Sequence, residues 1–168
     1  MLFRSAVNNA GIAGPQAFTA EYPLDGWDQV IAVNLSGVFY GMKYQLPAMI
    51  ASGGGSIVNV ASILGAVAFR GAPAYVAAKH GVLGLTQNAA VEYAPHKVRV
   101  NSVGPAFINT PLLDGLSPAI TERLVGMHPI GRLGEGAEVA ELVTWLSSDK
   151  ASFVTGAYYP VDGGFLAQ

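Results

Sequence analysis

Apolar residues recur along this chain at two different spacings, and together they predict alternating strands and helices. Short apolar runs of the kind found in buried strands occur at Ala6-Val7, 56–61, 98–103 and 156–161. Apolar residues at every third or fourth position, which are typical of helices, occupy 24–50, 74–93 and 135–146. Strands that alternate with helices of this length predict an α/β fold with a mainly parallel sheet.

Glycine and proline mark the boundaries of these elements. Gly53, Gly54 and Gly55 separate a helix from the next strand, and Pro105 is expected to break the strand that precedes it. The stretch 112–134 is expected to form short helices and loop, as a lid over a site. Together with Phe107, its apolar residues indicate an apolar pocket, and they are Leu113, Leu116, Leu124, Val125 and Met127.

Composition and charge exclude several classes of protein. Of the 168 residues, 51% are hydrophobic and 12% are charged, which predicts one buried core over 1–168 and excludes intrinsic disorder. The net charge of −2 provides no field that would gather nucleic acid or an anionic membrane. The apolar stretches are shorter than the roughly 20 residues of a spanning helix. We expect neither a nucleic-acid partner nor a membrane span.

Two further absences narrow the chemistry. The chain has no cysteine, so disulfides, thiolate metal ligands and a cysteine nucleophile are excluded. His80, His96 and His128 have no carboxylate or histidine at ligand spacing, and we predict no metal site. The first five residues lack the apolar core of a signal peptide, and we expect a cytoplasmic location.

Three side chains are candidates for acid–base chemistry. Tyr75 and Lys79 lie four positions apart on a predicted helix, so they share one face with Cβ atoms about 5–6 Å apart. A nearby ammonium stabilises a phenolate, and we expect Lys79 to lower the pKa of Tyr75 from its ordinary value of about 10. Ser62 follows the carboxyl end of a predicted strand, where open parallel sheets bind ligands. A tyrosine and a lysine at this spacing, taken alone, more commonly form a surface contact.

In combination with Asn34, these residues resemble the Asn-Ser-Tyr-Lys tetrad of the classical short-chain dehydrogenase/reductase family. The nearest resemblance is to the subfamily of 3-oxoacyl-carrier-protein reductases and of sugar or steroid alcohol dehydrogenases. Supporting segments follow the family's order over nearly the whole chain, at Asn8-Asn9-Ala10-Gly11, 33–37, 99–105, Thr155-Gly156 and 161–164.

The resemblance implies an NAD(P)-dependent oxidoreductase that interconverts a secondary alcohol and a ketone. Tyr75 would exchange a proton with the substrate oxygen, Ser62 would orient that oxygen, and Lys79 would bond the nicotinamide ribose. Asn34 would interrupt its helix so that a main-chain carbonyl holds a water linked to Lys79. The implied cofactor contacts are Asn9, Ala10, Gly11, Tyr75, Lys79, Pro105, Ile108 and Thr110.

No segment of this sequence resembles the family's first three strands or its glycine-rich turn, which holds the cofactor pyrophosphate. We therefore expect 1–168 to form a single C-terminal part of the family's domain. Its fold would be a partial Rossmann-type, doubly wound and mainly parallel sheet, with the family's fourth strand as an open edge. NAD or NADP binding is expected to be weak or absent, with activity impaired. The helices near 35–50 and 74–93 are expected to form a homo-oligomer.

Two other functions remain open. A cofactor-independent hydrolase, such as an esterase, would use Ser62, Tyr75 and Lys79, although no serine lies in a G-x-S-x-G or S-x-x-K segment. An inactive fold would serve association only. Some residues also have structural alternatives, in which Asn9 stabilises the central strands, Ser62 caps the loop after its strand, and Arg132 is solvated.

Overall fold

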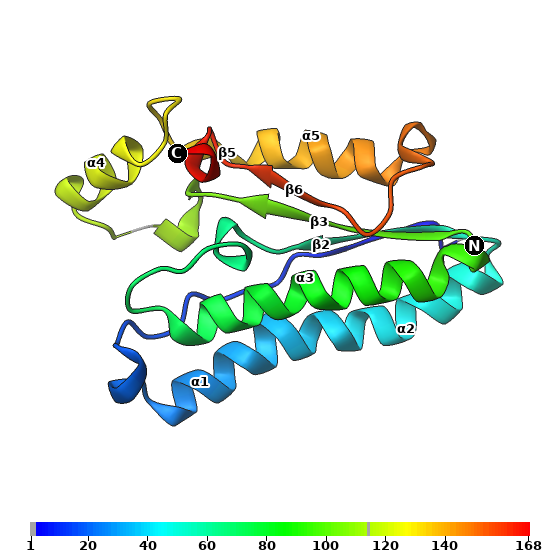
Figure 1. Cartoon of the computed structure of the whole chain (residues 1–168), viewed down its shortest axis with the longest axis horizontal. Helices are drawn as coiled ribbons and strands as arrows, with labels where there is room; N and C mark the ends of the chain where they lie inside the picture. Colours follow the sequence, from blue (N-terminus) through cyan, green and yellow to red (C-terminus); the bar gives the residue numbers. More distant parts are fainter. Residues whose placement is uncertain (1–2, 114) are drawn as a thin grey trace.

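Four parallel strands form the centre of the molecule. The computed structural model describes residues 3–113 and 115–168, and Figure 1 shows the sheet between two helical layers. The strands lie in the order β1-β2-β3-β6, and all three pairings are parallel. Their bounds are Ser5–Asn8 for β1, Gly55–Val60 for β2, Val98–Pro105 for β3 and Tyr158–Val161 for β6. This arrangement confirms the expected α/β fold and mainly parallel sheet.

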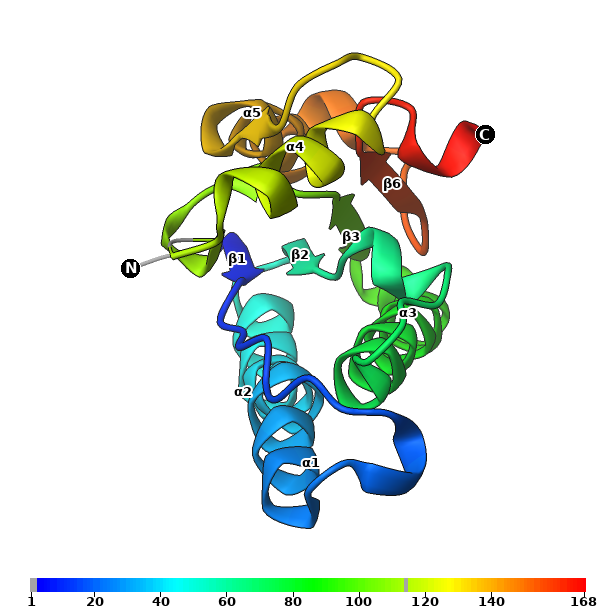
Figure 2. The same cartoon turned by 90° about the vertical axis from the view of Figure 1, so that its left-hand side faces the viewer.

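Helices cover both faces of this sheet. On one face lie α1 (Leu24–Ile31), α2 (Gly37–Ala51) and α3 (Pro73–Tyr93), with a π-helical segment at Ala32–Ser36 that joins the first two. On the other face lies α5 (Gly136–Ser147), which packs on β2 and β3. The short helix α4 (Pro118–Gly126) lies beyond the end of the sheet. Figure 2 shows the molecule from this end, with the strands seen along their length.

The apolar core is divided by the sheet. The larger cluster joins α2 and α3 to the strands, and Met49, Ile57 and Val100 are completely buried in it. A second cluster, with Val58, Val103 and Leu146, lies between the sheet and α5. Because β2 and β3 are buried on both faces, their polar side chains are hydrogen-bonded inside the protein, and these are Ser56, Asn59, Asn101 and Ser102.

Short elements complete the chain. A two-stranded parallel ladder joins β4 (Ile108–Asn109) to β5 (Gly134–Glu135), and the sequence pattern does not predict it. Single 3₁₀ turns occur at Thr19–Glu21, Ile63–Gly65, Ala94–His96, Pro111–Leu113, Asp149–Ala151 and Phe165–Ala167. The predicted lid over 112–134 therefore consists of loop, a turn and α4.

The strand ends at Pro105, as predicted, and includes the proline itself. Pro105 is the last residue of β3 and aligns with Val161 of β6. The hydrogen bond at this point is donated by the N–H of Ala106 to the carbonyl of Val161, at 3.1 Å. A proline is accommodated because its missing N–H is not required for that bond.

Asn8, and not Asn9, ties the first strand to its neighbours. The Asn8 amide donates to Asn59 Oδ1 of β2 at 2.8 Å and exchanges hydrogen bonds with the Gln45 amide of α2. The alternative in which Asn9 stabilises the central strands is therefore wrong, because side chains alternate along a strand and its continuation. Asn9 itself is exposed.

Neither a membrane-spanning helix nor a cluster of metal-ligating side chains occurs among the described residues. In 3–113 and 115–168 no helix is both long and apolar enough to cross a membrane. Over the same residues, no three His, Cys, Asp or Glu side chains gather as a metal ion would require.

Candidate functional site

A pocket of about 250 Å³ lies beyond the carboxyl ends of β2 and β3. It is bounded by the turn after β2, the start of α3, the residues after β3, the 13–16 loop and the lid. Four of the predicted site residues line it together, and they are Ser62, Tyr75, Ile108 and Thr110. Open parallel sheets bind ligands at this end because successive strands end there in diverging loops.

Ser62 is held at the base of this pocket by its own backbone. It is buried and extended, and its Oγ accepts a hydrogen bond from the N–H of Leu64 at 3.1 Å as the cap of a 3₁₀ turn. Its carbonyl accepts a hydrogen bond from the hydroxyl of Tyr158 at 3.0 Å. A Cβ at position 104 would collide with the ring of Tyr158, so Gly104 permits this contact. The capping alternative for Ser62 is therefore correct, and the same residue also lines the pocket.

Tyr75 lies in the first turn of α3 and lines the pocket together with Ser62, whose hydroxyl is within hydrogen-bond reach. Burial raises the pKa of Tyr75 above 10.0, and the Ser62 hydroxyl lowers it by a smaller amount. The prediction that Lys79 lowers the pKa of Tyr75 is thus wrong for this chain. The Lys79 ammonium lies 5.5 Å from the centre of the Tyr75 ring, above its face, and makes no direct contact with the hydroxyl that titrates.

Lys79 is buried one helical turn further along α3, with 3% of its surface exposed. Its Nζ donates a hydrogen bond to the carbonyl of Val60 at 2.8 Å, at the end of β2. Burial lowers the pKa of Lys79 from 10.5 to about 8. The cause is the cost of placing a charge in a region of low polarity. The ammonium has three hydrogens, of which Val60 takes one.

Asn34 lies in the π-helical segment, where one extra residue widens the helix between α1 and α2. Its completely buried amide accepts from the N–H of Ile12 and donates to the carbonyl of Ile12, at 2.9 and 2.8 Å. The interruption predicted for this helix is therefore present. A Cβ added to Gly11 would lie 3.5 Å from Asn34 Oδ1 and 3.7 Å from Lys79 Nζ, so Gly11 leaves a small space bounded by these two polar groups.

The remaining predicted cofactor contacts surround the same region. Asn9, Ala10 and Gly11 form the exposed strand-to-loop connection after β1. Pro105 accepts a long hydrogen bond of 3.5 Å from Ser62 through its carbonyl oxygen. The hydroxyl of Thr110 donates to the carbonyl of Ile108 at 3.3 Å, which fixes its rotamer beside the pocket.

The apolar part of the pocket is only partly as predicted. Phe107, Leu113, Leu116 and Leu124 line it as expected, whereas Val125 and Met127 are not among its lining residues. A helix of the lid presents only one side to the pocket, and adjacent residues of α4 point elsewhere. Sequence reasoning missed several lining residues from distant segments, namely Gln16, Ile63, Leu64, Phe69 and Ile120.

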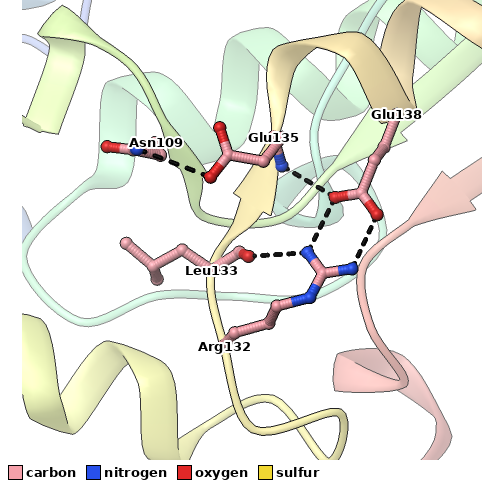
Figure 3. Close-up of polar contacts among 5 residues, drawn as sticks. All are labelled: Asn109, Arg132, Leu133, Glu135 and Glu138. Carbon is pink, nitrogen blue, oxygen red and sulfur yellow. Dashed lines mark hydrogen bonds and ion pairs between the residues drawn. The ribbon is translucent and has the colours of Figure 1, made fainter.

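Arg132 is exposed, in agreement with the solvated alternative, and is also paired with a carboxylate. Its guanidinium donates to both oxygens of Glu138 at 2.8 and 2.7 Å, and the same carboxylate accepts from the N–H of Glu135 (Figure 3). Glu138 thereby caps the start of α5 and holds β5 in place. Since β5 pairs with β4, this network supports the strand that carries Ile108 into the pocket.

Comparisons with known proteins agree with this arrangement. The family model described as "Enoyl-(Acyl carrier protein) reductase" matches residues 3–166. A cyclohexanol dehydrogenase from Acinetobacter sp. (strain SE19) is 52% identical over 163 residues, which cover 97% of this chain and 64% of that protein. A 3-oxoacyl-[acyl-carrier-protein] reductase from Thermotoga maritima is 42% identical over 95% of this chain and 65% of its own length.

Solved structures give the same result. The crystal structure of a putative 2-deoxy-D-gluconate 3-dehydrogenase from Agrobacterium tumefaciens with bound NADP superposes with a TM-score of 0.93 at 37% identity. That match covers 98% of this chain and 68% of the other. This chain thus spans about two thirds of the length of the proteins it matches.

Proposed function

Because this chain belongs to the short-chain dehydrogenase/reductase family, we propose that it contributes the substrate half of an NAD(P)-dependent oxidoreductase that interconverts a secondary alcohol and a ketone. The observation that carries this proposal is the pocket in which Ser62, Tyr75, Ile108 and Thr110 meet. Two hydroxyls converge at one end of an otherwise apolar cavity, which suits one substrate oxygen on an apolar body.

Tyr75 has the environment of a group that holds and returns a proton. Burial raises its pKa, so the hydroxyl is protonated at neutral pH and is a hydrogen-bond donor toward a carbonyl oxygen. Ser62 presents its hydroxyl beside it, from a backbone fixed by the bonds to Leu64 and Tyr158. In this proposal Ser62 orients the substrate oxygen, and Tyr75 gives the proton that a ketone gains on becoming an alcohol.

Lys79 and the residues around it fit the nicotinamide end of a cofactor. The ammonium uses one hydrogen for Val60, and its remaining donors lie beside the space that Gly11 leaves open. A ribose bears hydroxyls that such donors bind. When bound, the nicotinamide supplies or accepts the hydride of the reaction. Ile108, Thr110, Pro105 and the exposed 9–11 connection would complete the protein's contacts with it, and Asn34 would position Ile12 and the 9–11 connection through its two hydrogen bonds.

The substrate class is proposed from the relatives. Proteins 52% and 48% identical to this chain are named cyclohexanol dehydrogenase and cis-4-hydroxycyclohexanecarboxylate dehydrogenase. A protein 40% identical is named levodione reductase. The compact, mostly apolar pocket supports the proposal that this chain also takes a cyclic secondary alcohol or ketone as its substrate.

No observation favours the hydrolase alternative. The Ser62 Oγ accepts from Leu64, and the Tyr75 hydroxyl beside it stays protonated at neutral pH because burial raises its pKa. The Lys79 Nζ donates to Val60, so among the described residues neither group is placed as a base for the serine. A serine nucleophile requires a base within hydrogen-bond reach.

The proposal is tested by assaying the purified chain with cyclohexanol and cyclohexanone at millimolar NAD(H) and NADP(H), beside p-nitrophenyl acetate. We expect absorbance change at the nicotinamide wavelength that depends on both the ring substrate and the nucleotide. Ester hydrolysis that requires Ser62 and ignores the nucleotides would establish the hydrolase instead. Absence of both activities would leave an association-only fold.

A further inference from the structure

The pocket beside Ser62 and Tyr75 is polar at one end and apolar over the rest of its wall. Besides these two hydroxyls, its polar lining consists of Gln16 and Thr110. The other lining residues are Ala, Gly, Pro, Ile, Leu and Phe, and no charged side chain lines the pocket among the residues that the structure describes. A ligand buried here therefore finds neutral hydrogen-bond partners and no counter-charge for an ionised group.

The apolar wall is stiff because aromatic rings support it. Phe69 and Phe107 meet edge to face with 5.9 Å between ring centroids. Phe107 packs in turn on Phe165 and on the ring of His128, which is buried behind it. Moving these packed rings to admit a longer ligand would cost packing energy. The volume of about 250 Å³ is also below the range of roughly 300–1,000 Å³ usual for drug-sized ligands.

The arginines of the 69–72 turn and of the loop before β5 have partners outside the pocket. The guanidinium of Arg70 lies 4.8 Å from the ring centroid of Phe18, in a neighbouring depression. Arg132 binds both oxygens of Glu138. Neither arginine lines the pocket, so neither offers a bidentate partner to a carboxylate there.

The outer wall is formed by α4, whose Ile120 lies on the boundary between pocket and solvent, 45% exposed. A substituent that extends from a bound ring toward this boundary would pass the Ile120 side chain. A carboxylate at that point would lose water against an aliphatic surface, which is unfavourable when no cation replaces the water.

Resting on the proposed function, we propose that this pocket selects uncharged, compact ketones and alcohols and rejects those that bear a carboxylate, with Ile120 as the residue that sets this selectivity. Carboxylated ring substrates are then excluded by desolvation.

The test compares two ring ketones of similar size with the full chain, namely 4-methylcyclohexanone and 4-oxocyclohexanecarboxylate. Binding is followed by NMR through the methyl signals of Leu113, Leu116 and Leu124, which line the pocket. We expect the uncharged ketone to shift these signals and the carboxylate to bind at least about tenfold more weakly.

Three variants separate charge from shape. Ile120→Lys places an ammonium at the mouth, and we expect the preference for the uncharged ketone to fall about tenfold or to reverse. Ile120→Met keeps an apolar side chain of similar volume and should keep the preference. Ala119→Lys adds the same charge on the exposed surface of α4 outside the pocket lining, and should also keep it.

Equal binding of the two ketones, binding of neither, or equal effects of Ile120→Lys and Ala119→Lys would each overturn the inference. The outcome is distinct from that of the proposed function, because binding is measured without turnover. Selective binding without nicotinamide-dependent turnover would support the proposed selectivity of the pocket and contradict the proposed reaction. Turnover of both ketones alike would retain the reaction and remove the selectivity.

Discussion

At the scale of single residues, Lys79 is the most unusual group in the site. Its ammonium is almost completely buried and donates a hydrogen bond to the Val60 carbonyl, and no carboxylate among residues 3–113 and 115–168 forms an ion pair with it. Burial without a counter-charge disfavours the protonated form, which is why its pKa falls to about 8. A lysine with this pKa exchanges a proton near physiological pH, a property that suits a group linked to proton transfer.

The buried lysine predicts a pH dependence of stability. Between pH 8 and 10.5 the unfolded chain keeps the Lys79 proton while the folded chain has released it, so the folded state gains stability as pH rises through this window. Thermal unfolding of wild type and Lys79→Met should therefore show wild type gaining relative to the variant between pH 7 and 9.5. The raised pKa of Tyr75 acts with the opposite sign, but only above pH 10. A constant difference between the two proteins would show that Lys79 titrates at its ordinary pKa.

Tyr75→Phe removes one hydroxyl and leaves the ring. We expect nicotinamide-dependent turnover to fall by about 10²–10⁴-fold, the usual contribution of a general acid or base. The unfolding temperature should change little, since the ring remains packed. Tyr44→Phe is the matched control, because Tyr44 is 73% exposed on α2 and distant from the pocket lining. Undiminished turnover in Tyr75→Phe would remove this residue from the mechanism.

At the scale of elements, the start of α5 depends on one carboxylate. Glu138 accepts from the N–H of Glu135 and from both terminal nitrogens of Arg132, and these bonds lower its pKa from 4.5 to about 2. An N-terminal capping box satisfies N–H groups that a helix leaves without partners. Because β5 immediately precedes α5, the same bonds stabilise the β4–β5 ladder beside the pocket.

Glu138→Gln should therefore destabilise the start of α5 at neutral pH. The stabilisation is fully present above about pH 4.5 and is lost as pH falls toward 2, because the folded state holds the carboxylate ionised. Amide exchange at Gly136 to Glu138 and at Ile108 should quicken in the variant. Glu141→Gln, on the same helix and without a recorded side-chain hydrogen bond, serves as the control. Unchanged amide exchange at Ile108 would show that the helix cap at Glu138 does not stabilise the strand beside the pocket.

At the scale of the whole molecule, α2 and α3 present an apolar outer surface. Phe39 and Tyr40 are 46% and 58% exposed, and a shallow groove beside them is floored by Gly81 and Gly84. Apolar residues gathered on one surface commonly mark an interface. The edge of β1 is a second candidate, since β2 is its one partner strand among the described residues.

We therefore predict self-association through the α2–α3 surface. Light scattering at micromolar concentration should give at least twice the mass of one chain, and Phe39→Lys should reduce it. Phe153→Lys is the control, because Phe153 is completely exposed in another part of the molecule. A monomeric wild type contradicts the prediction. Association that survives Phe39→Lys would assign the contact to another surface, such as the β1 edge.

We predict that this chain alone binds NAD(H) or NADP(H) weakly. Lys79, Ile108 and Thr110 serve the nicotinamide end, but the 168 residues contain no glycine-rich turn joining a strand to a helix N-terminus for the pyrophosphate. Two or three lost charge-assisted hydrogen bonds, each worth about 1.5–3 kcal/mol, weaken binding at least about a hundredfold. Calorimetry with NADH or NADPH should give a dissociation constant that is submillimolar or weaker. A low-micromolar constant would indicate that a second chain supplies the missing donors.

The sequence by itself determined the order of strands and helices and the family. Apolar periodicity is a local property, so the helix over 24–50, the strand ends and the Tyr75–Lys79 pair follow from neighbouring residues. The interruption at Asn34 and the four-strand parallel sheet were predicted through the family's segments and are present in the structure.

Only the tertiary structure decided the electrostatics and the shape of the site. The pKa of Tyr75 rises instead of falling because burial, which the sequence spacing does not report, outweighs the neighbouring groups. The pairing of Arg132 with Glu138 and the contact of Tyr158 with Ser62 join residues from separate elements. Phe69 and Ile120 reach one pocket from segments far apart in the chain. A cavity is a property of packing among several elements, and no local pattern encodes which side chains will meet there.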